Sequence, residues 1–372
     1  MPRLLDRLDA ATGLVPEFLD ADVDYLERRP PPLQLVDAEG HYNAGWYERF
    51  DGALNLDDSM ALDGALQRWL HLTLDAPDHF IVLNLADMGK ASNTAVLVVD
   101  KATGTFREAS LTGLGPAGHV SVSDDARRFV DAHHASMARF HGEDDARLSF
   151  SMHAEGLHVT GVARRAIGPT FVQVTRYQRG RGSLQWYGNL ELEAGILTLD
   201  DQVIPLPPGT LGTFDRTVGH QRGIQAWNWL AVAGQARCAE TGRVVPIGIQ
   251  VARDRPGARP RVESKKHAVW LEGELHKIPT AAFAYDIVDE GERMTSDWRL
   301  TSPSANSAAP EPAWLDLTFR PRFHRRELKR LLIAKTDFNQ YYGEVEGRLR
   351  VQGRTWELLP TFAVTEESWL EL

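Results

Sequence analysis

The chain has almost no cysteine, the residue that builds disulfide frameworks and many metal sites. Cys238 is the single cysteine among 372 residues, which excludes an internal disulfide and any site built from several cysteines. Histidine is more plentiful at 13 residues. However, there is no HExxH motif, and His134 and His141 are seven residues apart, too far for two ligands on one helix face. We therefore expect no metal site and no cofactor.

Long apolar runs and basic charge are also lacking. The segment Met1–Asp9 carries acids where an export signal needs an apolar core, and no later run is long enough to span a bilayer. The formal net charge is −10 and the pI is about 5.7, which argues against nucleic acid or an anionic membrane as the main partner. We expect a cytoplasmic protein with no membrane span.

Short runs rich in β-branched residues make up most of the chain. Glycine or a polar turn separates them, as in the turn Asp100–Gly104 and at Gly156. This pattern is typical of an all-β sandwich or barrel rather than of βαβ units. The clearest predicted strands are Phe80–Ala86, Thr94–Asp100, Arg147–His153 and Leu157–Val162.

The chain length favours two domains. Spaced leucines followed by Pro30–Pro32 predict an N-terminal helical lead-in over residues 1–32. We expect a first β-barrel-like domain over 33–212, with one helix near 123–141 that begins at Asp124 and Asp125, and a second over 213–372. The predicted fold class is therefore all-β with a few helices, in two antiparallel β-barrel or sandwich domains packed together.

One stretch combines an acid with two indoles. Asp215 precedes Gly219 and His220, and Trp227-Asn228-Trp229 follows. A carboxyl group in a dry, aromatic pocket keeps its proton near neutral pH, and indole faces stabilise a developing cation. Equally, a buried aspartate often only accepts hydrogen bonds, and most buried indoles only pack.

His220 has two interpretations of similar weight. It could relay a proton to or from Asp215, or it could be a surface loop histidine. The basic segment Arg320–Arg330 could grip phosphate, but in so acidic a chain it is better explained as a solvated loop.

The spacing of Asp215, Gly219 and the Trp-Asn-Trp run resembles DUF2804. This family of unknown function lies in the two-barrel, lipocalin-like (calycin) superfamily that includes carotenoid 1,2-hydratase, tocopherol cyclase and AttH-type proteins. Further segments resemble the family's motifs in the same order: Val245–Gln250, Trp270–Pro279, Leu317–Pro321, Phe338–Gly347, and Glu366-Glu367 with Trp369.

The resemblance implies two lipocalin-like barrels with a ligand cavity at or near their interface. It implies catalytic roles for Asp215 and His220, and ligand-binding roles for Trp227, Asn228, Trp229, Arg222, Gln340 and Tyr342. The chain has Val218 where the family commonly has arginine, so an ion-pair partner for Asp215 is either absent or supplied by Arg216 or Arg222.

Three hypotheses for function follow. The first is binding of an apolar, lipid-like, isoprenoid or polyketide molecule with acid-catalysed hydration, cyclisation or isomerisation, which would make the protein a lyase or isomerase. The second is a non-catalytic carrier of a hydrophobic ligand. The third is a structural module without a cavity. The residues do not decide whether the protein is an enzyme, nor its oligomeric state.

Overall fold

A computed structural model describes residues 24–371 with gaps at 57–65, 89–90, 115–128, 134–137, 144–145, 178–180, 221–223, 255–264, 290, 292–293, 303–312 and 331–334. All regular structure in the described residues is β, which confirms the predicted all-β class. The chain divides into two compact units. We call Glu27–Gln221 the N-terminal unit, and Arg222–Leu372 together with Met1–Leu26 the C-terminal unit.

The N-terminal unit is built around one antiparallel sheet. Its main path has the order β5-β4-β3-β2-β12-β10-β9-β8-β7-β6, with β1 paired to β9 and β11 to β10. The strands are β1 (Gly45–Tyr47), β2 (Leu66–Asp75), β3 (His79–Asp87), β4 (Ala91–Asp100), β5 (Phe106–Leu114), β6 (Phe129–His133), β7 (Ala138–Glu143), β8 (Arg147–Ala154), β9 (Leu157–Arg176), β10 (Gly182–Leu199), β11 (Gln202–Leu206) and β12 (Leu211–His220).

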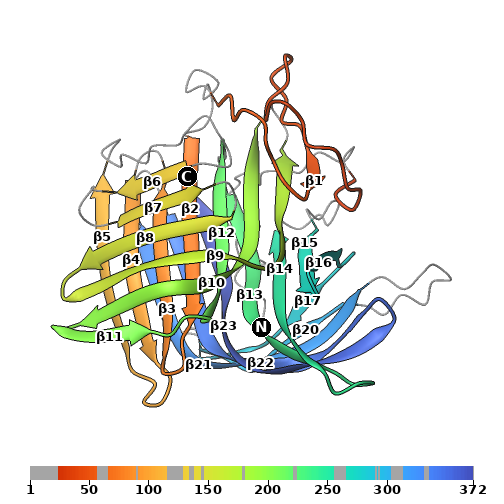
Figure 1. Ribbon diagram of the computed structural model, residues 1–372. Coiled ribbons are helices and arrows are strands. Elements are labelled where there is room, and N and C mark those ends of the chain that lie inside the picture. Colours follow the sequence, from red (N-terminus) through yellow and green to blue (C-terminus); the bar gives the residue numbers. More distant parts are fainter. Residues whose placement is uncertain are drawn as a thin grey trace. The chain divides into compact units, whose positions relative to one another are not determined.

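The sheet of the N-terminal unit curls over itself. Strands β8 to β10 cross β3 to β5, and the two halves enclose a core (Figure 1). Leu83 and Val96 come from one half of the sheet, while Phe150 and Leu192 come from the other. The predicted strands in this region are confirmed. In the predicted turn, the Asp100 Oδ1 atom accepts hydrogen bonds from the backbone N–H groups of Ala102 and Thr103, at 2.9 and 2.8 Å.

The helix predicted near 123–141 is wrong in its described part. Residues 129–133 and 138–143 form β6 and β7, which pair with each other and with β8. Along β7, Ala138 and Phe140 are buried whereas Arg139 is exposed, which is the alternation of a strand. Histidines and alanines hid this period of two in the sequence. The rest of the predicted helix lies outside the described residues.

Residues 24–32 of the predicted helical lead-in are not helical. They contain a turn and an isolated bridge between Arg28 and Trp46. Residues 1–23 lie outside the described part of the chain. Among the described residues there is also no helix of the length and apolarity that a membrane span requires.

The C-terminal unit contains a second antiparallel sheet, with the order β16-β15-β14-β13-β23-β22-β21-β20-β17, and a separate pair, β18 and β19. The strands are β13 (Ile224–Cys238), β14 (Val244–Asp254), β15 (Lys266–Leu271), β16 (Glu274–Lys277), β17 (Ala282–Ala284), β18 (Ile287–Asp289), β19 (Met294–Thr295), β20 (Trp298–Thr301), β21 (Trp314–Arg330), β22 (Lys335–Val351) and β23 (Arg354–Glu371).

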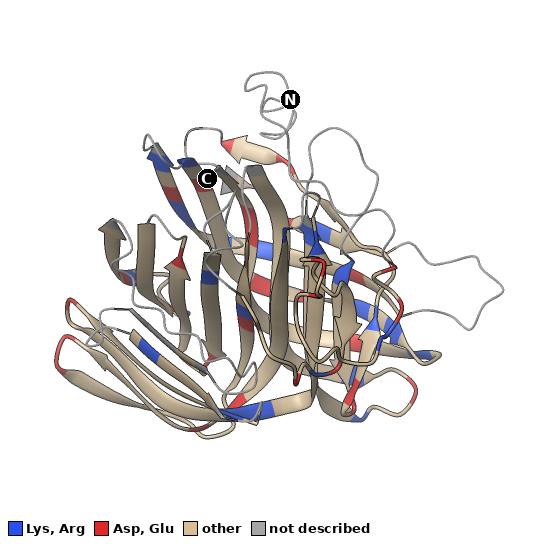
Figure 2. Ribbon diagram, turned by 90° about the horizontal axis from the view of Figure 1, so that it is seen from above, with Lys and Arg blue, Asp and Glu red and all other residues tan. Residues whose placement is uncertain are grey.

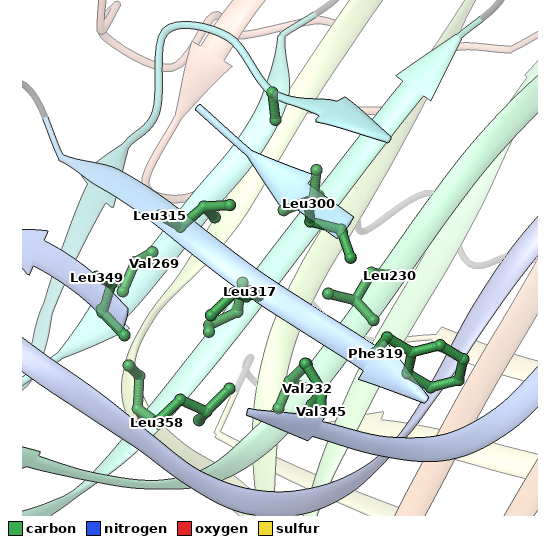
Figure 3. Close-up of a cluster of buried hydrophobic side chains, with 14 of the residues drawn as sticks. Leu230, Val232, Val269, Leu300, Leu315, Leu317, Phe319, Val345, Leu349 and Leu358 are labelled. Carbon is green, nitrogen blue, oxygen red and sulfur yellow. The ribbon is translucent and has the colours of Figure 1, made fainter. Parts of the chain in front are cut away.

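The concave face of this second sheet holds an aliphatic core. Leu230, Val232, Leu317, Phe319 and Val345 converge there from β13, β21 and β22 (Figure 3). Side chains alternate between the two faces of a strand. On β13 the even-numbered residues therefore enter the core, and the odd-numbered residues lie on the opposite face.

Strand β23 contains one extra residue relative to both of its neighbours. The register with β22 shifts between the pairs Val345–Thr361 and Gly347–Leu358, and the register with β13 shifts over the same part of β23. The extra residue falls at Leu359-Pro360. Proline lacks the N–H that a regular ladder position uses, so a bulge suits it. The bulge switches the faces: Leu358 enters the core before it, and Ala363 enters the core after it.

Gly219, part of the sequence motif, is explained by close packing. A Cβ atom there would lie 2.3 Å from the carbonyl oxygen of Gly182 on the adjacent strand. Gly188, on the same two-strand ladder, has no neighbouring atom within 4 Å of such a Cβ.

We expect Gly219→Ala to lower the free energy of unfolding by about 1–3 kcal/mol because backbone must move. Gly188→Ala should change it by less than about 0.5 kcal/mol. Urea unfolding of both variants measures the difference. Equal stability of the two variants would show that β12 and β10 do not need this close approach.

Candidate functional site

Four strands of the C-terminal unit bring one acid between aromatic and polar side chains. In the sheet register, Glu366 of β23 lies opposite Trp229 of β13 and opposite Gln340 of β22, and Arg325 of β21 lies opposite Gln340. Directly paired side chains on one face are about 5 Å apart. All four lie on the face opposite the core, and for Glu366 this depends on the bulge at Leu359-Pro360.

Hydrogen bonds hold both oxygens of the Glu366 carboxyl group. Trp227 Nε1 donates to Oε2 at 2.7 Å, and Gln340 Nε2 donates to Oε1 at 2.8 Å. The Tyr342 hydroxyl in turn donates to Gln340 Oε1 at 2.8 Å, which fixes the amide. The carboxyl group is therefore oriented from two sides, by the Trp227 indole at one oxygen and by the Gln340 amide, itself held by Tyr342, at the other.

Burial raises the pKa of Glu366 to about 7, while the hydrogen bonds from Trp227 and Gln340 and the charge of Arg325 act in the opposite direction. Arg325 also donates to Glu327 Oε2 at 3.0 Å, so its charge is shared with a second acid. A substantial fraction of Glu366 then carries a proton at neutral pH, which is the state a general acid needs.

Apolar side chains border Glu366 on the side of β13 and along β23. Trp229 is only 5% exposed, and the ring of Trp227 lies 6.2 Å from that of Phe338 between centroids. Val364 occupies the same face of β23 and is fully buried. Indole faces next to a carboxylic acid suit an apolar ligand that gains positive charge.

The structure brings together four of the residues implied by the resemblance and gives Asn228 a different place. Trp227, Trp229, Gln340 and Tyr342 lie on the Glu366 face. Asn228 lies on the core face, where its Nδ2 atom donates to the Tyr285 hydroxyl at 3.1 Å and to the Glu366 backbone carbonyl at 3.3 Å. It therefore stabilises β23 beside the site instead of lining it.

Asp215 and His220 both belong to β12 in the N-terminal unit. They are five residues apart on a regular strand, so their side chains point to opposite faces. The imidazole Nδ1 of His220 lies 3.0 Å from the Tyr42 hydroxyl. The predicted proton relay from His220 to Asp215 therefore has no support in the geometry.

The residue directly opposite half-buried Asp215 is His71 on β2. Burial lowers the pKa of His71 to about 3, so its imidazole is neutral at neutral pH. Arg216 faces the other side of β12, where its guanidinium carbon lies 4.7 Å from the centre of the Trp186 ring. Arg222, the other predicted partner of Asp215, lies outside the described residues.

The basic segment Arg320–Arg330 is not a phosphate clamp in this structure. It forms part of β21, and acids on β22 pair with it: Arg320 with Glu346, and Arg322 with Glu344, each at 2.7 Å. Basic and acidic residues are interspersed along the strands (Figure 2). The predicted solvated loop is therefore wrong, because the segment is a strand that carries charged side chains.

Comparison with known proteins then identifies the family. The model of a domain of unknown function, DUF2804, matches residues 27–369. The chain belongs to this family. The resemblance inferred from the sequence is thereby confirmed. A search of curated proteins found no match.

Solved structures show the same fold at low sequence identity. CghA is similar with a TM-score of 0.54 and 14% identity, over 91% of this chain and 96% of that chain. The structure of CghA with Sch210972 has a TM-score of 0.54 and 12% identity, over 92% of this chain and 97% of that chain. An AttH-like protein from Nitrosomonas europaea gives 0.50 and 13%, over 86% and 97%. These likenesses establish the two-barrel fold.

Glu366 also makes stability depend on pH. Because its folded-state pKa of about 7 lies above its ordinary 4.5, folding favours the protonated form. The folded state should therefore lose up to about 3 kcal/mol from this group as pH rises from 4.5 through 7. Glu366→Gln should remove this loss.

Urea unfolding at pH 5 and pH 8 tests the expectation. The stability difference between these pH values should be smaller in Glu366→Gln than in the wild type, and the variant should be the more stable of the two at pH 8. An unchanged pH dependence would show that Glu366 ionises at its ordinary pKa.

Proposed function

We propose that the C-terminal unit binds an apolar small molecule at the Trp227–Trp229 face and that Glu366 protonates it. The observation that supports this most strongly is the buried Glu366 carboxyl group, oriented by Trp227 and Gln340 and able to hold a proton at neutral pH. Asp215, the acid predicted from the sequence, is half-buried and accepts a hydrogen bond from the Thr217 hydroxyl at 3.4 Å.

The proposed reaction begins with transfer of the Glu366 proton to a C=C bond of the substrate. The indoles of Trp227 and Trp229 stabilise the resulting cation, an effect of up to about 2 kcal/mol where water is excluded. Attack by water completes a hydration, attack by a second double bond followed by loss of a proton completes a cyclisation, and direct loss of a neighbouring proton completes an isomerisation. Glu366, then a carboxylate, accepts the proton released in each case. No cofactor takes part in these steps.

The comparisons are consistent with a small-molecule ligand. One protein of this fold was crystallised with the small molecule Sch210972. At 12% identity this likeness supports the fold, and the inference of an apolar ligand for the present chain depends on the indole-lined face.

Deuterium incorporation tests the proposed proton donor. The full-length protein is incubated in D2O with a panel of linear polyenes and terpenoids, and products are analysed by mass spectrometry. Wild type should introduce deuterium at carbon. Glu366→Gln should reduce the rate by about 100-fold or more, the typical effect of losing a general acid.

Glu367→Gln is the matched control because it makes the same change one residue away, on the core face. It should retain the wild-type rate. If Asp215→Asn abolishes deuterium incorporation while Glu366→Gln does not, Asp215 is the acid and the proposal is wrong. If the wild type binds the polyenes and returns every one unlabelled, the protein is a carrier.

A further inference from the structure

The N-terminal unit also aligns an acid with aromatic and polar side chains. In register across β9, β10, β12 and β2 lie Phe171, Tyr187, Asp215 and His71. The rings of Phe171 and Tyr187 are stacked with centroids 5.6 Å apart. These four residues share one face of the sheet.

The neighbouring positions on this face are polar. Thr217 lies opposite Gln185, and Thr213 lies opposite Asn189, so that the two amides flank Tyr187 along β10. All four side chains are buried, with Gln185 at 5% exposure and Asn189 at 2%. A buried sheet face normally carries apolar side chains, so this composition needs a separate explanation.

Two of these buried groups have unused hydrogen-bonding capacity. Gln185 Oε1 and Asn189 Nδ2 are inaccessible to solvent, and neither has a hydrogen-bond partner among the described residues. The Ser183 hydroxyl lies two residues before Gln185 on the same face, and it too is buried without a hydrogen-bond partner among the described residues. Buried polar atoms are almost always hydrogen-bonded in native proteins, so these groups indicate a face that polar groups of another molecule meet.

The chemistry of the face defines that molecule. Gln185 Oε1 and the Asp215 oxygens accept hydrogen bonds, Asn189 Nδ2 donates, and the Ser183 hydroxyl does both. Acceptors of this kind select hydroxyl groups, and a face rich in acceptor oxygens disfavours an anionic ligand. The stacked rings of Phe171 and Tyr187 provide a surface for a flat ring.

We propose that the face formed by Asp215, His71, Tyr187, Gln185 and Asn189 is a binding site for a neutral, hydroxylated organic molecule. His71, which the sequence analysis did not single out, contributes a neutral imidazole to this site and lies beside Asp215 in the register. Asp215 is thereby a ligand-binding residue. This site is independent of the function proposed for Glu366, because it uses residues of the N-terminal unit only.

A pair of matched probes tests the site on the full-length protein. Resorcinol is a neutral ring with two hydroxyl groups, and 1,3-dimethoxybenzene is the same ring without hydroxyl hydrogens. Binding is followed by NMR of 15N-histidine-labelled protein, with the His71 signals assigned by their loss in His71→Gln. Resorcinol should shift these signals in a saturable way, and its dimethyl ether should bind about tenfold or more weakly.

Two near-isosteric variants locate the binding. Asp215→Asn and Gln185→Met should each weaken resorcinol binding by about tenfold, since each removes an acceptor oxygen while keeping the side chain at a similar size. Asp200→Asn, which makes the same change at an exposed aspartate, should bind as the wild type does. Thermal unfolding confirms that each variant is folded.

The proposal is overturned if resorcinol gives no saturable shift, if the ether binds equally well, or if both Asp215→Asn and Gln185→Met bind like the wild type. Those results would mean that the buried amides only take part in the packing of the fold and meet no ligand. Because Glu366 takes no part in these measurements, they leave the deuterium experiment unaffected.

Discussion

The removal of one carboxyl group from water is the constraint on which the chemistry proposed for the C-terminal unit depends. Glu366 is buried, and the two donors that hold its oxygens, an indole and an amide, are both neutral. Hydrogen bonds of this kind orient a carboxyl group without forcing it to ionise as strongly as a direct ion pair would. The group is therefore both fixed and protonatable, a combination that solvent exposure or a salt bridge would destroy.

The two units present comparable arrangements built from unrelated residues. In one, an acid lies between tyrosine and histidine; in the other, an acid lies between tryptophan and glutamine. The surroundings differ in character. Besides Tyr187 and His71, threonines and amides border Asp215, whereas two indoles and Val364 border Glu366 besides Gln340 and Arg325. We infer a division of labour in which one sheet face recognises hydroxyl groups and the other acts on hydrocarbon.

Much of the fold could be predicted from the sequence, but the central acid could not. The strand runs and the Asp100 turn are local signals, and the order of family motifs identified the barrels. Trp227 and Trp229 on β13 could be recognised because they also belong to a family motif. Two features escaped the sequence analysis for different reasons, one local and one not. β7 disguised its period with small and polar residues, and the face of Glu366 is set by a bulge. Counting by twos from Leu358 would place Glu366 inside the barrel and Glu367 outside.

Arg222 illustrates a different limit, since it lies outside the described residues and its role stays a prediction. His220 shows how close spacing in a sequence misleads on an extended strand, where an odd separation puts two side chains on opposite faces.

The single inserted residue at Leu359-Pro360 has a wider consequence. Because it alone decides which of two adjacent acids leaves the core face, a relative lacking the insertion would keep the same letters yet turn the first acid toward that face, where Asn228 and Asn339 flank the position that Glu367 now holds. Inheritance of the proposed chemistry should thus follow strand length between two tryptophans, Trp356 and Trp369, more faithfully than it follows the presence of glutamate.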